Sequence, residues 1–501
     1  MPQKNQFKPL PPIEDIAPHI FLYWKMRKPD TEVVKLLQEE HIDRAIYGIG
    51  LTSYKAIRRR LGLLSARQQG HTVESIKESM VALRKRFPKA GARDMGSLLF
   101  HHYGMLVPRD LIVVYFRVYE PELIRERKAR RLRRRRFWAA GVNDIIAVDQ
   151  HDKWKRFGLA LHNGGDPFDG YIHWYKIWWT NSNPKLIASY YLNVVEKNKC
   201  IPLITQSDPG SENYGIANAQ TTLRHMHDPR LIGTIQHRWM RKKKNIKPEI
   251  SWSQLRSRFT PGFEDLLDYG VNNGLYDIGR PLDLYLFIPF LQVELDAWTD
   301  MVNNTQKRSD RNKILPHGIP QHIHLFPERY GCLDFKIQVS QEAIDEVRQI
   351  FAPPEDPVFQ LVPPEFKHYA DILYQSMESP VLTSENIWEV YSELLYRFEN
   401  LDNAVDFIEE CQVYIEAMEL QDNEDNENSF KPQGRDLFGG IDNSKSDGTY
   451  YMGGVNNGHG LDNEHYRILD AMDENDGELE IDEVQFTDDE NEEDEGEDVL
   501  I

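Results

Sequence analysis

Three acidic residues lie where their side chains could act together on a metal ion. Asp149 ends an apolar run that begins at Ile145, Asp208 follows residues 202–205, and Glu249 lies at a predicted helix start. An acid at the carboxyl end of a buried strand projects from the sheet edge, where neighbouring parallel strands also end. We therefore expect Asp149, Asp208 and Glu249 to meet, although 59 and 41 positions separate them. Taken singly, each acid would equally suit a turn or a helix cap.

Converging carboxylates predict a site for Mg²⁺ or Mn²⁺. A pair of such ions, about 3.5–4 Å apart, needs oxygen ligands and open positions for a phosphodiester and its nucleophile. We therefore expect two ions, with Asp149, Asp208 and Glu249 as catalytic and metal-binding residues. Asp152 also suits a solvated loop beyond the strand, paired with Lys153 or Arg156. Three residues close to the acids are expected to support them: Asp152, Glu212 and Asn213.

The residues around the acids follow the periodicities of an α/β domain. Period-two runs predict strands and a 3.6-residue period predicts helices. The aromatic run at residues 174–179 suits a strand packed on both faces better than a surface that stacks on bases. The expected order is βββαβαβα: strands at residues 145–149, 157–162 and 170–178 with a turn at 163–167, a helix over 184–198, a strand at 202–205, a helix from near Asn213, a strand at 231–235, and a helix entered through Pro248 and Glu249.

These motifs resemble the integrase core of the DDE superfamily, the fold of retroviral integrases and many cut-and-paste transposases. The likeness covers residues 137–330. In a related eukaryotic family the first strand resembles Val-Asp-Gln-His-Asp-Lys-Trp, and the second motif is Asp-x-Gly-x-Glu-Asn, matched from Asp208 to Asn213. The third resembles Asn-Gln-Arg-Ile-Glu-x-x-Trp. Here Lys247 and Pro248 replace its Arg and Ile, while the Asn, Glu249 and Trp252 are kept.

The resemblance implies a fold, an activity and partners. The fold would be an α/β ribonuclease-H-like integrase core. The activity would be metal-dependent cleavage and strand transfer of double-stranded DNA, acting on transposon ends and target DNA, with a homo-oligomer joining two ends. One alternative is a catalytically silent DNA-binding chromatin or regulatory protein of transposon origin. Another is a ribonuclease or structure-specific nuclease on the same fold.

Charge is distributed unevenly along the 501 residues. The net charge is −19, but residues 421–501 carry −22 and residues 1–148 carry +14. A basic region gains affinity for DNA through release of counterions. The average charge therefore does not exclude nucleic acid as a partner.

The basic N-terminal region, residues 1–136, is expected to be all-α. Residues 1–70 predict helices at 30–39 and 51–63, the second capped by Thr52 or Ser53, which resembles a helix-turn-helix but also suits a plain helical hairpin. Residues 71–136 predict helices at 73–86, 92–102 and 108–118, followed by a run in which nine of twelve residues are basic. That run suits DNA contact, nuclear localisation or both. The expected DNA-binding residues are Lys55, Arg58, Arg59, Arg60, Arg133, Arg134, Arg135, Arg136, Arg241, Lys242, Lys243, Lys244 and Lys247.

Residues 321–420 carry no further predicted catalytic cluster. Helices are expected over residues 259–277 and 281–305, and residues 331–420 predict a small helical domain with helices at 365–377, 384–399 and 404–418. Residues 421–501 have the composition of a disordered acidic tail, which could solubilise the protein, restrain DNA binding or meet basic chromatin proteins. With three scattered cysteines, no signal peptide and no apolar run long enough for a membrane span, we expect a soluble nuclear protein.

Overall fold

The computed structural model describes residues 8–120, 139–240, 245–307, 315–400, 413–414 and 430–437. These residues divide into two compact units, one reaching residue 120 and the other beginning at residue 139. The Arg-rich run with Arg133–Arg136, the predicted helix at 404–418 apart from two residues, and the acidic tail beyond residue 437 lie outside the described residues.

The first unit is helical throughout its described elements, as expected. Thr72 caps one helix at the predicted position, because its hydroxyl accepts a hydrogen bond from the Ser75 N–H at 3.2 Å. The other predicted helices also form, within three residues of the expected bounds. The helices are α1 (Ile13–Lys25), α2 (Asp30–Leu36) with a π-helical turn (Leu37–His41), α3 (Leu51–Arg60), α4 (Ala66–Gln69), α5 (Val73–Arg86), α6 (Ala92–Tyr103) and α7 (Arg109–Tyr119).

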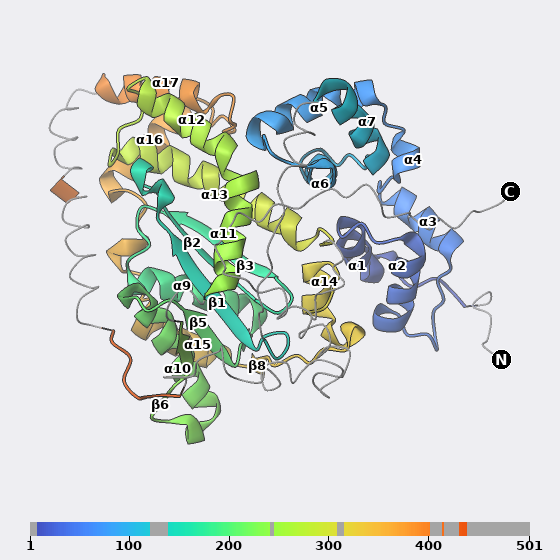
Figure 1. Cartoon of the computed structure of the whole chain (residues 1–501), viewed down its shortest axis with the longest axis horizontal. Coiled ribbons are helices and arrows are strands. Elements are labelled where there is room, and N and C mark those ends of the chain that lie inside the picture. Colours follow the sequence, from blue (N-terminus) through green and yellow to red (C-terminus); the bar gives the residue numbers. More distant parts are fainter. Residues whose placement is uncertain are drawn as a thin grey trace, which may run out of the picture. The chain divides into compact units, whose positions relative to one another are not determined.

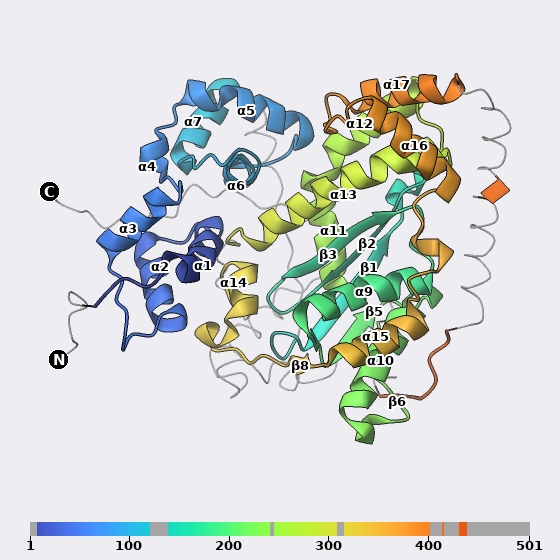
Figure 2. The same cartoon turned by 180° about the vertical axis from the view of Figure 1, so that it is seen from behind.

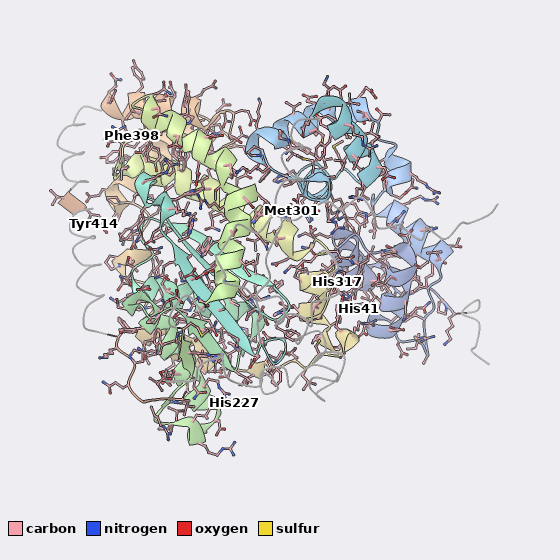
Figure 3. The ribbon with its side chains drawn as sticks, in the orientation of Figure 1. His41, His227, Met301, His317, Phe398 and Tyr414 are labelled. Atoms are coloured by element: carbon pink, nitrogen blue, oxygen red, sulfur yellow. The ribbon has the colours of Figure 1, made fainter. Side chains whose placement is uncertain are left out.

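Two details of the first unit differ from expectation. Helix α3 begins one or two residues before the predicted caps, with Gly50 at its N-cap. The unpredicted α1 packs against the π-helical turn, where the Tyr23 hydroxyl and His41 Nε2 are 2.8 Å apart (Figure 3). Arg27 at the end of α1 donates to Ser97 Oγ of α6 at 2.8 Å, so the two halves of the unit share a buried contact.

The second unit is built on a five-stranded mixed sheet with strand order β3-β2-β1-β5-β7. The first three strands pair antiparallel in chain order, and β5 and β7 are added parallel on the other side of β1 (Figure 1). This is an α/β structure, as predicted. The strands are β1 (Ile145–His151), β2 (Ala160–Gly165), β3 (Ile172–Trp178), β5 (Ile204–Ser207) and β7 (His237–Trp239).

Alternation along β1 divides its side chains between two layers. Ile146 and Val148 enter the apolar core that α9 (Pro184–Asn198), α10 (Tyr214–His227) and α15 (Gln341–Phe351) build on one face of the sheet (Figure 2). On the other face, α11 (Ile246–Arg258) packs against β1 and α13 (Pro281–Asn303) packs against β3. Because successive residues of a strand face opposite sides, Asp149 lies on the face that α11 covers.

Two predictions for the sheet are wrong. Residues 163–165 belong to β2 rather than to a turn, since Asn163 pairs with both Asp149 and Tyr175. Gly164 is required there because a Cβ would meet the Trp174 ring at 2.3 Å. The strand expected at 231–235 is reduced to β6 (Thr234–Ile235), which pairs with β9 (Arg435–Asp436), and β7 takes its place in the main sheet.

The C-terminal helices close around α13. Helices α12 (Thr260–Asn272), α16 (Pro364–Ser376) and α17 (Ile387–Glu399) form near the predicted positions. Phe398 of α17 stacks on Phe366 of α16 with ring centroids 4.9 Å apart (Figure 3). Helix α15 and the short α14 (Pro320–Leu325) were not predicted. Among the described helices, none combines the length and the apolarity that crossing a bilayer requires.

Asp283, at the start of α13, makes stability depend on pH. The residue is buried, and this burial raises its pKa to about 7. The pKa of Asp283 is higher in the folded protein than the unfolded value of 3.8. The stability that its protonated form contributes is therefore fully present below about pH 4 and is lost as pH rises through 7. We expect Asp283→Asn to flatten this decline, by at most about 4 kcal/mol. Chemical unfolding from pH 4 to 8 measures how the free energy of unfolding changes with pH. Asp265→Asn, at an exposed position, is the control. Parallel pH profiles for Asp283→Asn and the parent would contradict the prediction.

Candidate active site

Asp149 lies among like charges two residues before the end of β1, which continues past the predicted strand end to His151. Burial, followed by the charges of Asp208 and Glu249, raises its pKa to about 8. The indole N–H of Trp252 partly offsets this rise, although it makes no hydrogen bond of normal geometry within the described residues. Asp149 is therefore within electrostatic reach of both other predicted acids, which come from two separate elements.

Asp208 follows β5 and lies close enough to Asp149 for its charge to raise the pKa of Asp149. Burial raises the pKa of Asp208, and the carboxylate of Glu212 raises it further. The amide of Asn213 donates to Glu212 Oε1 at 2.9 Å and to the Asp208 carbonyl at 3.3 Å. Gln150, which strand alternation turns away from Asp149, donates to the same Glu212 oxygen. Glu212 and Asn213 thus lie beside Asp208, where the sequence placed them.

Glu249 lies in the first turn of α11, whose position is fixed by polar contacts with the sheet. Asn245 precedes the helix and is fully buried; its amide donates to the Val148 carbonyl at 2.9 Å and accepts from Gln206 Nε2 at 3.1 Å. These bonds tie the helix start to β1 and β5, the strands that carry Asp149 and lead to Asp208. Pro248 is accommodated because the first turn of a helix has no use for its missing N–H.

Further along α11, aromatic packing holds the helix against the sheet. Trp252 stacks on His151 with ring centroids 4.9 Å apart and contacts Tyr175 of β3 at 5.2 Å. The Tyr175 hydroxyl donates to the Ser251 carbonyl at 3.1 Å. Asn245, Trp252 and Tyr175 were not predicted as site residues. Asn245 and Trp252 belong to the third sequence motif, which was the signal that could have identified them as site residues.

Asp152 points away from the three acids. Its carboxylate accepts a hydrogen bond from Asn181 at 3.0 Å and pairs with Lys155 at 3.1 Å, and its side chain is 59% exposed. Lys155 therefore takes the place of the partners expected for Asp152, and Arg156 pairs with Asp268 instead. Asp152 belongs to the solvated loop rather than to the acidic site.

The predicted DNA-binding residues have different surroundings. Lys55, Arg59 and Arg60 are exposed on α3. Arg58 is buried and bonded to Asp30 of α2, so the prediction that it contacts DNA is corrected to a structural role. Lys247 lies in the first turn of α11. The remaining predicted contacts lie outside the described residues: Arg133, Arg134, Arg135, Arg136, Arg241, Lys242, Lys243 and Lys244.

The acidic site has the donors that divalent cations require. Oδ1 of Asp208 is buried and accepts no hydrogen bond from the described residues, so a ligand atom is free. The three acids are not among the described groups whose ligand atoms all lie within 4.8 Å.

A second set of metal-ligating side chains lies elsewhere in this unit. Asp166, Asp169 and His324 each offer one ligand atom, all within 4.8 Å of one another, and could hold a metal ion. No local sequence pattern groups these three residues. No protein-family model matches the chain, and no curated protein matches it either.

The like charges around Asp149 should cost stability. In metal-free protein at pH 9, Asp149→Asn removes a buried charge that Asp208 and Glu249 repel. We expect the free energy of unfolding in EDTA to rise by about 1–3 kcal/mol. Asp152→Asn, which removes an exposed carboxylate, is the control and should change it little. A variant at Asp149 that is no more stable than this control would show that the three carboxylates do not repel one another.

Proposed function

We propose that the second unit catalyses divalent-metal-dependent cleavage and strand transfer of double-stranded DNA, as a transposase-like or integrase-like enzyme. The observation that carries this proposal is the electrostatic coupling of Asp149 with Asp208 and Glu249. A protein gains nothing in stability by burying like charges together, so their convergence favours a role in binding cations.

The sheet also supports the proposal. Three antiparallel strands in chain order, followed by two parallel strands on the far side of β1, are what the resemblance to a ribonuclease-H-like integrase core implies. In this topology the ends of β1 and β5 lie side by side, which brings Asp149 and Asp208 to one edge. Helix α11 then supplies Glu249 from above the same face.

In this proposal the residues of the site divide into ligands and supports. Asp149, Asp208 and Glu249 would hold Mg²⁺ or Mn²⁺. When bound, two such ions supply Lewis-acid activation of a phosphodiester and its nucleophile. Asn245 fixes the start of α11 so that Glu249 faces β1, and Trp252 excludes water from one side of Asp149. Asn213 orients Glu212 and the Asp208 loop.

DNA is the substrate that charge favours. Residues 1–148 carry +14, and the exposed Lys55, Arg59 and Arg60 on α3 offer contacts to phosphates. Nuclear localisation and a homo-oligomer that joins two DNA ends are part of the same proposal. A protein that binds DNA without cutting it would share the basic surface but would not need the acidic site.

The test is a cleavage and strand-transfer assay on the full chain. Labelled transposon-end duplexes, taken from sequence flanking the gene, and target DNA are incubated with Mg²⁺ or Mn²⁺. We expect Asp208→Asn to lower product formation by more than about 100-fold, the upper end of what loss of a contact that supports a metal ligand costs. Asp152→Asn is the matched control and should retain activity, because its carboxylate points to solvent.

The other outcomes separate the alternatives. DNA binding with no cleavage by the parent under any metal would reject the enzyme in favour of a silent binding protein. Cleavage of RNA–DNA hybrids alone would favour a ribonuclease. Equal activity in Asp208→Asn and the parent would reject the proposed site.

A further inference from the structure

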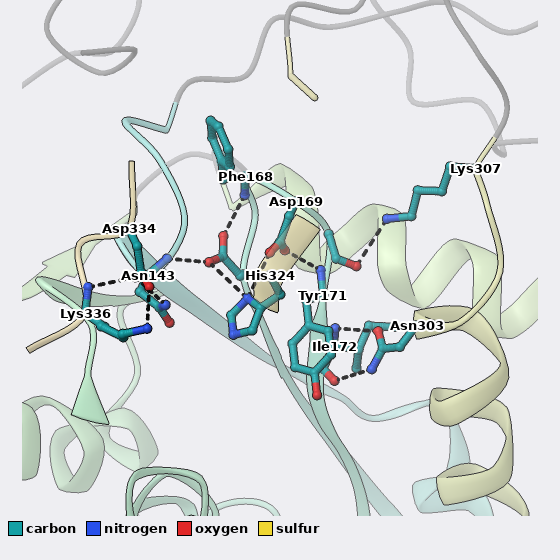
Figure 4. A network of polar contacts seen from close by, with 12 residues as sticks. Asn143, Phe168, Asp169, Tyr171, Ile172, Asn303, Lys307, His324, Asp334 and Lys336 are labelled. Atoms are coloured by element: carbon teal, nitrogen blue, oxygen red, sulfur yellow. Dashed lines mark hydrogen bonds and ion pairs between the residues drawn. The ribbon is translucent and has the colours of Figure 1, made fainter. Parts of the chain in front are cut away.

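A second group of potential ligands is buried at the opposite end of β1 from Asp149. Asp149 pairs with Asn163, whereas Ala147 pairs with Gly165, so Asp166 comes next along β2 toward the start of β1. Asp166 and Asp169 lie in the connection from β2 to β3, and His324 comes from α14 (Figure 4). This group is therefore separate from the proposed catalytic acids.

The three side chains converge with little exposure. His324 Nδ1 lies 2.8 Å from Asp169 Oδ2 and 4.0 Å from Asp166 Oδ2. Both aspartate side chains are 0% exposed and the histidine side chain is 11% exposed. The mixture of two carboxylates with one imidazole distinguishes the group from a simple acidic cluster and is a ligand set that transition metals accept.

Charge gives independent evidence for a bound cation. Within the described residues, His324 is the one basic group that pairs with either aspartate. Two lysines of the same network have other partners: Lys307 donates to the Gly170 carbonyl at 3.1 Å, and Lys336 pairs with Asp334 at 2.7 Å (Figure 4). Two buried carboxylates against one imidazole leave uncompensated negative charge even when the imidazole is protonated. Such a charge is costly unless a cation or a proton neutralises it.

The surroundings orient the ligands. The backbone N–H groups of Asn143 and Phe168 donate to Asp166 at 2.7 and 2.9 Å, and that of Tyr171 donates to Asp169 at 2.6 Å (Figure 4). The His324 ring stacks on Tyr171 with centroids 4.4 Å apart. Hydrogen bonds to ligating carboxylates and a fixed imidazole ring are what metal sites use to hold their ligands in place.

We propose that Asp166, Asp169 and His324 bind one structural Zn²⁺ ion that joins α14 to the β2–β3 connection. The imidazole favours Zn²⁺ over Mg²⁺, which prefers oxygen ligands. His324 is 155 residues from Asp169 along the chain, so the ion would close a long loop and add its binding free energy to that of folding.

The test uses tag-free full-length protein purified without chelator. We expect about one zinc per chain by mass spectrometry of the metal, in the parent and in Asp208→Asn. We expect at least a 10-fold loss of zinc affinity in Asp169→Asn, which keeps the oxygen that accepts from Tyr171. Chelation should lower the melting temperature of the parent, and stoichiometric Zn²⁺ should restore it. Retention in Asp208→Asn separates this site from the proposed active site.

Titration with Co²⁺ keeps the proposal falsifiable if Asp169→Asn does not fold. Metal-depleted parent should develop visible absorption bands that saturate at one Co²⁺ per chain and disappear when Zn²⁺ is added. Absence of these bands, together with a melting temperature that Zn²⁺ does not change, would overturn the proposal and leave a proton-neutralised pair of aspartates. Zinc bound equally well by Asp169→Asn and the parent would also overturn it.

Discussion

The second unit depends on how β1 divides its side chains between two faces of the sheet. Ile146 and Val148 are committed to the apolar core beneath α9, α10 and α15. That commitment places Asp149 on the opposite face, because a slip of one residue would turn its charge into the apolar core and move the apolar pair to the face that α11 covers. The apolar residues of β1 thereby determine the direction in which its acid points.

Hydrogen bonds between the sheet and the start of α11 also fix the position of the third acid, Glu249. Asn245 bonds to the carbonyl of Val148, the residue directly before Asp149. It also accepts from Gln206, two residues before Asp208. A single buried amide therefore fixes the start of the helix relative to β1, which carries Asp149, and to β5, which leads to Asp208. The position of Glu249 follows from these bonds and from the packing of Trp252 on His151.

The sequence predicts elements with local signals well and elements that depend on distant partners poorly. Helix α5 begins and ends as expected, because Thr72 caps its start and its apolar residues repeat at helical spacing. The same holds for α9, where Asn183 accepts from the Lys185 N–H before Pro184 begins the helix. In contrast, Asn163 and the two glycines after it have the composition of a turn. They are strand residues only because β1 and β3 pair with them.

The same distinction applies to the two groups of ligands. Asp149, Asp208 and Glu249 could be grouped because each ends or begins an element that the local pattern reveals. His324 lies on a six-residue helix with no cap signal, and Asp166 and Asp169 have the spacing of ordinary turn residues. Only tertiary contact brings them together.

The two groups also differ in how much of the buried charge the protein itself balances. Among the three proposed catalytic acids, Oδ1 of Asp208 accepts no hydrogen bond from the described residues, and burial together with the charges of Asp208 and Glu249 raises the pKa of Asp149. The aspartates near His324 each receive backbone hydrogen bonds and one shared imidazole. The two proposed sites thus lie toward opposite ends of β1.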